Sequence, residues 1–282
     1  GGRARYFFIA KNKEEVKAAV LWANSNKQKI FVLGSGTNLL ISDQGFKGLV
    51  LKPDLKFIEA RGNRIYVGAG ILMPELLEFT LKHRLSGLEW AGGLPGTLGG
   101  AIRGNAGAFK GEIKDNLESV ESLSTKTLKI SKRKPKACQF SYRNSFFKKR
   151  DGKEIVVAAA LKLKPGNRQS IERAIGEKIN YRVSRHPLEY PNTGSTFKNV
   201  DVRKFPKAIL NQVKHVVKTD PFPVIPTAYL ISEAGLKGLK RGQAMVSPKH
   251  PNFIVNLGGA KASDVKAVIK VVKTKIKRKF KI

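Results

Sequence analysis

Cysteine is almost absent from this 282-residue sequence, and histidine is scarce. The single cysteine, Cys138, excludes an intramolecular disulfide and a thiolate cluster; it lies in a basic, strand-like segment, and we expect it to be structural. The four histidines show neither i, i+4 spacing nor an H-E-x-x-H arrangement, so no zinc or iron site is expected. The chemistry of this chain must therefore depend on other residue types.

Long apolar runs are also missing. The longest of them, residues 155–161, is far shorter than the roughly 20 residues that a membrane-spanning helix needs. No signal peptide is visible, although the chain starts with Gly-Gly and has no initial methionine. We expect a cytoplasmic protein without a membrane partner.

Acidic residues are few, since 21 Asp and Glu stand against 54 Lys and Arg, which gives a formal net charge of +33. Such a charge suggests a nucleic-acid partner, but the basic residues occur in almost every segment. No helix-turn-helix, zinc finger or aromatic RNA-binding strand is present to carry them. We expect the densest runs, residues 126–136 and 273–281, to be solvated surface, and the basic field to attract an anionic small molecule.

Glycine is concentrated in residues 91–109, AGGLPGTLGGAIRGNAGAF, which hold seven of them. Each glycine in a regular element costs roughly 0.5–1 kcal/mol relative to alanine, so the segment favours a ligand or a backbone that approaches it closely. No G-x-x-x-x-G-K-[ST] motif occurs anywhere, which argues against ATP or GTP hydrolysis. We read the segment as a long ligand-binding loop.

A second glycine-rich turn, Gly34-Ser35-Gly36-Thr37-Asn38, follows the apolar run at 29–33. Leu39 replaces the third glycine of a dinucleotide fingerprint and no helix pattern follows, so a Rossmann site is not expected. Successive N–H groups, with the Ser35 and Thr37 hydroxyls and the Asn38 amide, suit a pyrophosphate. A tight connection between strands is the alternative, and it is the alternative for Gly68-Ala69-Gly70 as well.

Hydrophobic periodicity predicts two domains, residues 1–165 and 166–282, divided at Pro165-Gly166-Asn167. In the first we expect a helix at 12–24 with Asn12 as its N-cap, a helix from Pro74 to near Gly87, and strands at 117–123, 127–132 and 155–163. In the second we expect helices from about Gln169 and at 226–234, a strand at 253–256, and a last helix with Ser263 as its N-cap.

Five blocks of sequence, taken together, indicate a protein family more specifically than any single motif does. They are GSGTNLLIS (34–42), GLPGTLGGAIRGNAGAF (93–109), YRNSFF (142–147), PNTGSTFKN (191–199), and AGLKG (234–238) with SPKHPNFIVN (247–256). In order, spacing and residue identity the chain resembles, over essentially its whole length, the bacterial UDP-N-acetylenolpyruvoylglucosamine reductase family. The short segment between the third and fourth blocks resembles the version of that family without an extra loop in the substrate domain.

The resemblance implies an α+β fold: a two-lobed FAD-binding domain of the vanillyl-alcohol-oxidase type followed by a smaller α+β substrate-binding domain. It implies an enzyme of peptidoglycan precursor synthesis in which NADPH reduces FAD. The reduced FAD then reduces UDP-N-acetylglucosamine enolpyruvate to UDP-N-acetylmuramate. Both glycine-rich segments fit FAD, because its pyrophosphate and long body must lie against exposed backbone.

The resemblance also assigns roles to residues. Arg143 matches the cation that stabilises an enolate, and Ser195 matches the proton donor; Asn199, Lys237 and His250 match residues that contact the UDP-sugar. The expected FAD-binding residues are Gly34, Ser35, Gly36, Thr37, Asn38, Gly96, Thr97, Gly99, Gly100, Asn105, Gly107 and Ala108. His250 has the alternative of being a structural polar residue beneath the site.

One departure concerns a catalytic Glu that the family carries a short way beyond the region matching the last helix, because this sequence has no acidic residue after Asp264. Either the sequence is clipped or the enzyme lacks that carboxylate, and the Gly-Gly start, which matches a family Gly-Gly block, favours a clipped sequence. We expect residues 1–282 to bind FAD but to turn over poorly. Two other functions stay open: a basic binding protein that has kept the fold without full catalysis, and a related FAD oxidoreductase with another substrate. The oligomeric state and the preference for NADPH over NADH also stay open.

Overall fold

The computed structural model describes residues 1–282, which divide into two units. Residues 3–36 and 46–181 form the N-terminal unit. Residues 1–2, 37–45 and 182–282 form the C-terminal unit. The loop at 37–45, which connects two strands of the N-terminal unit, therefore belongs by its contacts to the other unit.

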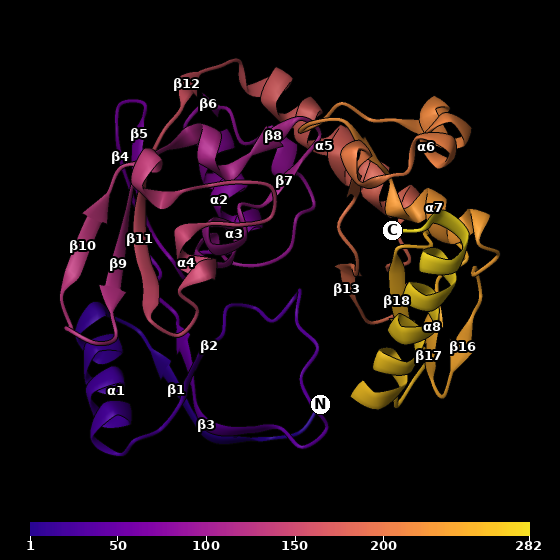
Figure 1. The fold of residues 1–282 in the computed structure, drawn as a ribbon. Coiled ribbons are helices and arrows are strands. Elements are labelled where there is room, and N and C mark those ends of the chain that lie inside the picture. The colour runs from indigo at the N-terminus through magenta and orange to yellow at the C-terminus, as the bar shows by residue number, and fades with distance from the viewer. The chain divides into compact units, whose positions relative to one another are not determined.

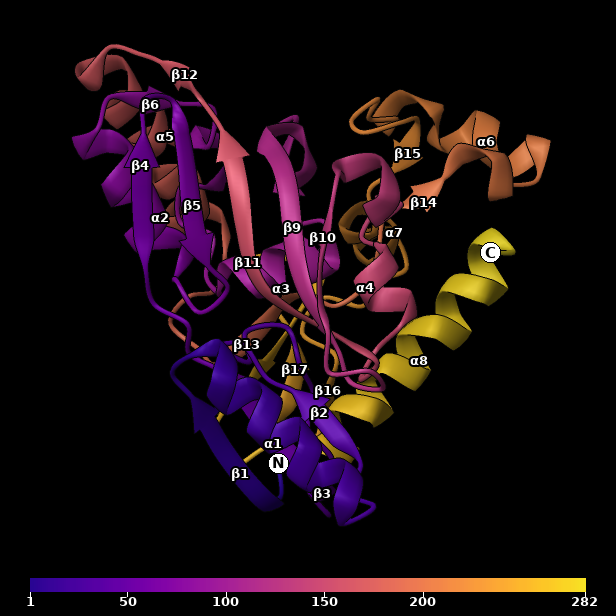
Figure 2. The same cartoon turned by 90° about the vertical axis from the view of Figure 1, so that its left-hand side faces the viewer.

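The first lobe of the N-terminal unit is a three-stranded parallel sheet in the order β1 (Ala4–Ala10), β3 (Phe46–Pro53), β2 (Ile30–Val32). Helix α1 (Lys13–Ser25) buries Val16, Ala19, Val20 and Ala23. Figure 2 shows this helix beside the three strands. Asn12 is confirmed as the N-cap, because its side chain accepts a hydrogen bond from the Glu15 N–H at 2.8 Å.

The second lobe is an antiparallel sheet, seen face-on in Figure 2. Its order is β10 (Ile130–Arg133), β9 (Leu117–Ser124), β11 (Glu154–Lys162), β5 (Arg64–Gly68), β4 (Ile58–Arg61). The strand predicted at 155–163 is confirmed as the central β11, while β10 begins later than the predicted residue 127. The other helices of this unit are α2 (Met73–Lys82), α3 (Leu98–Gly104), α4 (Phe146–Lys149) and the first part of α5 (Arg168–Arg185), with the 3₁₀ turns η1 (Glu89–Ala91), η2 (Ile113–Asn116) and η3 (Pro135–Cys138).

Two short antiparallel pairings complete the unit, β6 (Leu85–Ser86) with β12 (Lys164–Pro165) and β7 (Gly107–Ala108) with β8 (Gly111–Glu112). Helix α2 ends at Lys82, earlier than the predicted Gly87, because the chain leaves the helix through His83 and a left-handed Arg84. No helix of the chain is both long enough and apolar enough to cross a membrane.

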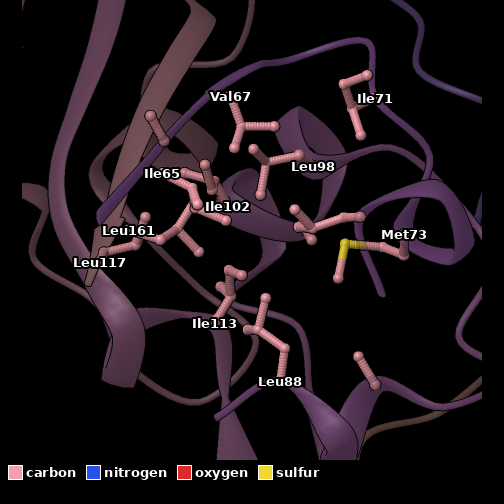
Figure 3. Packing of buried hydrophobic residues seen from close by; sticks show 14 of the residues in the cluster. Ile65, Val67, Ile71, Met73, Leu88, Leu98, Ile102, Ile113, Leu117 and Leu161 are labelled. Carbon is pink, nitrogen blue, oxygen red and sulfur yellow. The ribbon is translucent and has the colours of Figure 1, made fainter. Parts of the chain in front are cut away.

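The core of the second lobe packs α3 against the sheet, as Figure 3 shows. Leu98 and Ile102 of α3 are fully buried and lie among Ile65, Val67 and Leu161 of the sheet. The residue between them that also faces the core is Ala101. This i, i+3, i+4 stripe gives a glycine-rich helix one apolar face.

The prediction that residues 91–109 form a loop throughout is therefore wrong. Residues 98–104 are helical, because burial of Leu98, Ala101 and Ile102 outweighs the weak helix propensity of the glycines. Thr97 caps the helix by accepting a hydrogen bond from the Gly100 N–H. Asn105 ends it in the left-handed conformation with φ 45°.

The sequence suggested a strand around Cys138, and this is wrong. Cys138 lies at the end of the 3₁₀ turn η3. The proline at 135 begins that turn, since its fixed φ suits the first position of a helix. The thiol is fully buried, and this burial raises the pKa of Cys138 to about 11. The thiolate is thus disfavoured, in keeping with a structural role.

The C-terminal unit contains an antiparallel sheet in the order β13 (Asn192–Ser195), β18 (Phe253–Asn256), β17 (Ala244–Val246), β16 (Lys240–Arg241). Helix α8 (Ala262–Phe280) runs beside β16 and β17 in Figure 1, and its Val268, Val272 and Ile276 are buried. The strand at 253–256 is confirmed. The remaining elements are α6 (Lys207–Val213), α7 (Thr227–Glu233), the pair β14 (Val200–Asp201) and β15 (Val224–Ile225), and the 3₁₀ turns η4 (Val202–Lys204) and η5 (Lys214–Val216).

The predicted N-cap of the last helix, Ser263, is wrong. The N-cap position is Lys261, which makes no side-chain cap, and Ser263 is already helical. The acceptors come from two carboxylates instead, Asp264 in the helix itself and Asp43 in the remote loop. A cap supplied from more than two hundred residues away leaves no signal next to the helix.

Helix α5 begins after Asn167, whose side chain accepts a hydrogen bond from the Ser170 N–H. The two units divide inside this helix, between Tyr181 and Arg182. The predicted boundary between two separately folding domains, between residues 165 and 166, stays a prediction.

Replacing Ile102 with alanine tests the packing of α3. Ile102 is 0% exposed, so the change should lower the free energy of unfolding by about 2–5 kcal/mol, from lost burial and a cavity. Ile130→Ala is the matched control, because Ile130 is 43% exposed and should cost about 0.5 kcal/mol or less. Urea unfolding followed by tryptophan fluorescence measures both; equal losses would contradict a core role for α3.

Candidate functional site

The turn at residues 34–38 follows β2 and offers unused donors. The last backbone donor before it is the Leu33 N–H, which donates to the Leu51 carbonyl at 2.9 Å. No backbone N–H of residues 34–38 donates a hydrogen bond within the chain. Gly36 has a positive φ of 72°, which turns the backbone so that neighbouring N–H groups can face one ligand. The turn can therefore bind an anion.

Four residues expected to bind the cofactor line one pocket of the N-terminal unit: Gly34, Thr97, Gly99 and Gly100. The pocket holds about 500 Å³ of space, part of which is open solvent. A Cβ on Gly34 would lie 2.8 Å from the Thr97 Oγ1, so a larger residue at position 34 would collide with the cap of α3. The fold thus joins two glycine-rich segments that are far apart in the sequence.

The two segments contribute different chemistry. The N–H groups of Leu98, Gly99 and Gly100 are already bonded, to the Ile71 carbonyl, the Ala69 carbonyl and the Thr97 Oγ1. The beginning of α3 therefore offers a ligand a backbone surface without side chains, but no free hydrogen-bond donors. The free donors lie in the 34–38 turn.

Sequence reasoning missed several residues of this pocket. Arg103 and Phe147 line it and lie inside the quoted blocks, so those blocks held a signal for them. Asp151 pairs with Arg103 at 2.9 Å. Glu154 begins β11 and accepts hydrogen bonds from Ser122 and Arg133, and nothing in the sequence marked it.

Arg143 is held against the glycine segment. Its Nη2 donates to the Gly107 carbonyl at 2.6 Å and its Nη1 to the Asn105 carbonyl at 3.4 Å. Arg143 itself has a φ of 53°, in the left-handed region. Its guanidinium has no carboxylate among its ion pairs, so it remains able to bind one.

Asn105 is 0% exposed, and its Nδ2 donates to the Ser141 carbonyl. Its Oδ1 is buried without a partner in the chain. A buried acceptor of this kind costs about 1–3 kcal/mol unless a ligand or water satisfies it. Ala108, the last of the expected cofactor residues, pairs with Gly111 in the β7–β8 ladder.

Ser195 lies at the end of β13, opposite Phe253 of β18. Its side chain is exposed and makes no hydrogen bond in the chain. The turn before it is fixed by Asn192, whose Oδ1 accepts from the Gly194 N–H at 2.9 Å. Ser195 belongs to the C-terminal unit and Arg143 to the N-terminal unit, so a shared site stays a prediction.

The three expected substrate residues all lie in the C-terminal unit. Lys237 is exposed and has no ion pair. The Oδ1 of Asn199 accepts from the Thr227 N–H, at the first residue of α7, which is a structural use of this amide. The Nδ1 of His250 is buried without a partner.

His186, which sequence reasoning did not select, packs against His250 at a ring-centroid distance of 5.4 Å and against Phe253 at 4.8 Å. Burial, together with the neighbouring His250, lowers the pKa of His186 to about 4. Burial also lowers the pKa of His250 below its usual value. Both rings are therefore neutral near pH 7, where His250 can offer either a donor or an acceptor.

The fold and the glycine-lined pocket agree with the comparisons to known proteins. Residues 4–126 match the profile of the FAD binding domain family. Residues 186–282 match that of the UDP-N-acetylenolpyruvoylglucosamine reductase C-terminal domain. Together these define the class, a flavoprotein oxidoreductase with an N-terminal FAD-binding domain.

The relatives define the family. The chain is 37% identical to the UDP-N-acetylenolpyruvoylglucosamine reductase of Carboxydothermus hydrogenoformans, over 100% of this chain and 86% of that one. It is 35% identical to that of Clostridium novyi, over 100% and 84%. The crystal structure of UDP-N-acetylenolpyruvylglucosamine reductase (MurB) from Thermus caldophilus matches with a TM-score of 0.76 and 32% identity, over 95% of this chain and 87% of that one. The chain belongs to the UDP-N-acetylenolpyruvoylglucosamine reductase family, which confirms the predicted family, the fold class and the FAD cofactor.

The residues present fit FAD. The free N–H groups of 34–38 suit its pyrophosphate, and the bare start of α3 allows close approach of its body. The Oδ1 of Asn105, a buried acceptor without a partner in the chain, suits the N–H of a flavin ring. No group of three or more His, Cys, Asp or Glu side chains is placed to hold a metal ion.

Gly34→Ala tests the pocket. The new Cβ would lie 2.8 Å from the Thr97 Oγ1 and force that cap to move, so FAD should bind at least about tenfold more weakly. Gly104→Ala, where a Cβ meets nothing within 4 Å, is the matched control and should bind FAD normally. Quenching of flavin fluorescence measures the dissociation constants. Normal binding by Gly34→Ala would place FAD elsewhere.

Proposed function

We propose that this chain reduces UDP-N-acetylglucosamine enolpyruvate to UDP-N-acetylmuramate, with NADPH as the reductant. The observation that carries the proposal is Arg143, whose guanidinium is fixed by two carbonyls of the glycine segment and lacks a carboxylate partner. A substrate carboxylate is the natural partner for such a cation. The matched family supplies the substrate class.

Bound FAD supplies the two-electron chemistry, hydride transfer from NADPH and onward to the enolpyruvyl group. Its expected binding residues are Gly34 to Asn38, Gly96, Thr97, Gly99, Gly100, Asn105, Gly107 and Ala108. The chain's own residues must then handle the charge and the proton.

Arg143 stabilises the charge. When a hydride reaches the β-carbon, the electron pair of the double bond moves onto the α-carbon and is delocalised into the adjacent carboxylate. A guanidinium remains protonated throughout and can donate two parallel hydrogen bonds to that group. Because carbonyl contacts already orient Arg143, little reorganisation is needed as the charge develops.

Ser195 donates the proton to the α-carbon in this proposal. Its hydroxyl is exposed on β13 and has no competing partner in the chain. A serine is a weak acid in water, so the developing negative charge and nearby cations must assist it. A proton returned from solvent then restores the hydroxyl.

The C-terminal unit binds the UDP moiety. The exposed ammonium group of Lys237 suits a phosphate, and the unpartnered Nδ1 of His250 suits a uracil or sugar polar group. Asn199, whose Oδ1 accepts a hydrogen bond at the start of α7, is the third residue of this proposed site. We also propose a cytoplasmic location and no nucleic-acid partner, because the basic residues form no base-reading element.

An anaerobic visible spectrum tests the whole proposal. NADPH should bleach the flavin band of the FAD-loaded chain, and UDP-N-acetylglucosamine enolpyruvate should restore it. Bleaching followed by recovery, even slow recovery, would support the proposed substrate. Bleaching with no recovery at all would contradict the proposed substrate, and a chain that cannot be loaded with FAD would contradict the flavoenzyme assignment.

Single-turnover kinetics separate the two catalytic residues from cofactor reduction. Ser195→Ala should leave bleaching by NADPH intact and slow the recovery by about 10²–10⁴-fold. Arg143→Lys should slow recovery by about 10²–10³-fold, because an ammonium cannot replace the bidentate guanidinium. Thr193→Ala, in the same strand as Ser195, is the control and should recover normally. Unchanged recovery in Ser195→Ala would assign the proton to another group.

A further inference from the structure

Asp43 caps a helix to which it is not adjacent in sequence. Its Oδ1 accepts a hydrogen bond from the Ala262 N–H at 2.7 Å, and its Oδ2 accepts one from the Ser263 N–H at 3.1 Å. These are the first two residues of α8, a helix of 19 residues. A carboxylate that satisfies two unpaired N–H groups at the positive end of a helix is a strong cap.

A second carboxylate completes this helix end from within. The Oδ2 of Asp264 accepts from the Lys261 N–H at 3.1 Å and from the Gln243 N–H at 3.2 Å. Asp264 ties α8 only to its own neighbourhood in the C-terminal unit. Asp43 ties α8 to the loop at 37–45. The chain thus offers a matched pair of caps that differ in what they hold.

The loop at 37–45 has few other restraints. No backbone N–H of residues 34–41 donates a hydrogen bond within the chain, and Leu40 and Ile41 are each 44% exposed. Backbone hydrogen bonding resumes at Ser42, whose carbonyl accepts hydrogen bonds from the N–H groups of Gly2 and Gly45. The segment is therefore anchored at Leu33 before it and at Ser42 and Asp43 after it.

We infer that Asp43 is a positioning residue of the flavin site: by capping α8, it holds the far end of the segment whose free N–H groups bind the pyrophosphate of FAD. The inference rests on the proposed assignment of residues 34–38 to that pyrophosphate. Without the anchor, the segment must lose more conformational freedom each time FAD binds. Asp43 acts through the backbone and does not contact the cofactor.

The ionisation state of the Asp43 side chain at neutral pH suits this role. The hydrogen bond from the Ala262 N–H, more than any other contact, holds the pKa of the Asp43 carboxyl below its usual value. The carboxylate is thus charged when the protein works and complements the helix end.

Linkage makes the effect reciprocal. If the cap favours FAD binding, then FAD binding must favour the cap to the same degree. The amide protons of Ala262 and Ser263 should therefore exchange more slowly when FAD is bound, although they belong to the substrate-binding part of the chain. A role of Asp43 confined to helix stability would not produce this response.

The experiment compares D43A, D43N and D264A in the full chain, freed of FAD and titrated with it. D43A should bind FAD at least about tenfold more weakly. D43N should lie between D43A and the unmodified chain, because one acceptor oxygen remains. D264A removes a cap from the same helix end and should lower the midpoint of thermal unfolding, yet bind FAD with an unchanged dissociation constant.

Hydrogen exchange supplies the second readout, which does not depend on turnover. FAD should slow exchange at Ala262 and Ser263 in the unmodified chain and in D264A, and much less in D43N. Equal FAD affinity in D43A and the unmodified chain, or an equal loss in D264A, would overturn the inference while leaving the proposed function intact. Failure of the unmodified chain to bind FAD would overturn the proposed function and the inference with it.

Discussion

The structure of the N-terminal unit depends on one constraint: α3 must pack into the core on one side and present bare backbone on the other. Leu98, Ala101 and Ile102 satisfy the first requirement, and Gly99 and Gly100 the second. A helix this short is marginal alone in water, so burial of its apolar stripe must hold it. The core of the second lobe therefore also supports the glycine-lined pocket that we propose as the FAD site.

The same constraint separates the functions of the two glycine-rich segments. A helix end that is hydrogen-bonded to Ile71 and Ala69 is rigid, but its first N–H groups are no longer available to a ligand. The 34–38 turn has the opposite properties, with free donors and no internal bonds. Rigidity and binding capacity thus come from different segments, which meet at the pocket that Gly34 and Thr97 both line. A turn built this way needs an external anchor, which is the physical case for Asp43.

How far the sequence could predict this arrangement depends on how local each feature is. The Asn12 cap and the strand at 253–256 follow from neighbouring residues and are confirmed. The Ser263 cap was wrong because the acceptor is Asp43, which no pattern around the helix could reveal. Likewise, the helix in the glycine segment required knowing that Ile102 is buried, and the pocket required knowing that Gly34 meets Thr97. Motif resemblance supplied Arg143, but only the structure shows the carbonyls that orient it.

The net charge of +33 has a structural counterpart in the way the few acidic residues are used. Many of them accept backbone N–H bonds at helix starts: Glu15, Asp43, Glu75, Asp115, Asp201 and Asp264. At such positions a negative charge complements the helix dipole, and a lysine would oppose it. Most basic residues, in contrast, lie on the surface, where a side chain can change with little effect on stability. A chain can therefore become strongly basic without losing its fold, provided that the acids at helix starts remain. The resulting field would favour the approach of NADPH and a UDP-sugar, both of them anions.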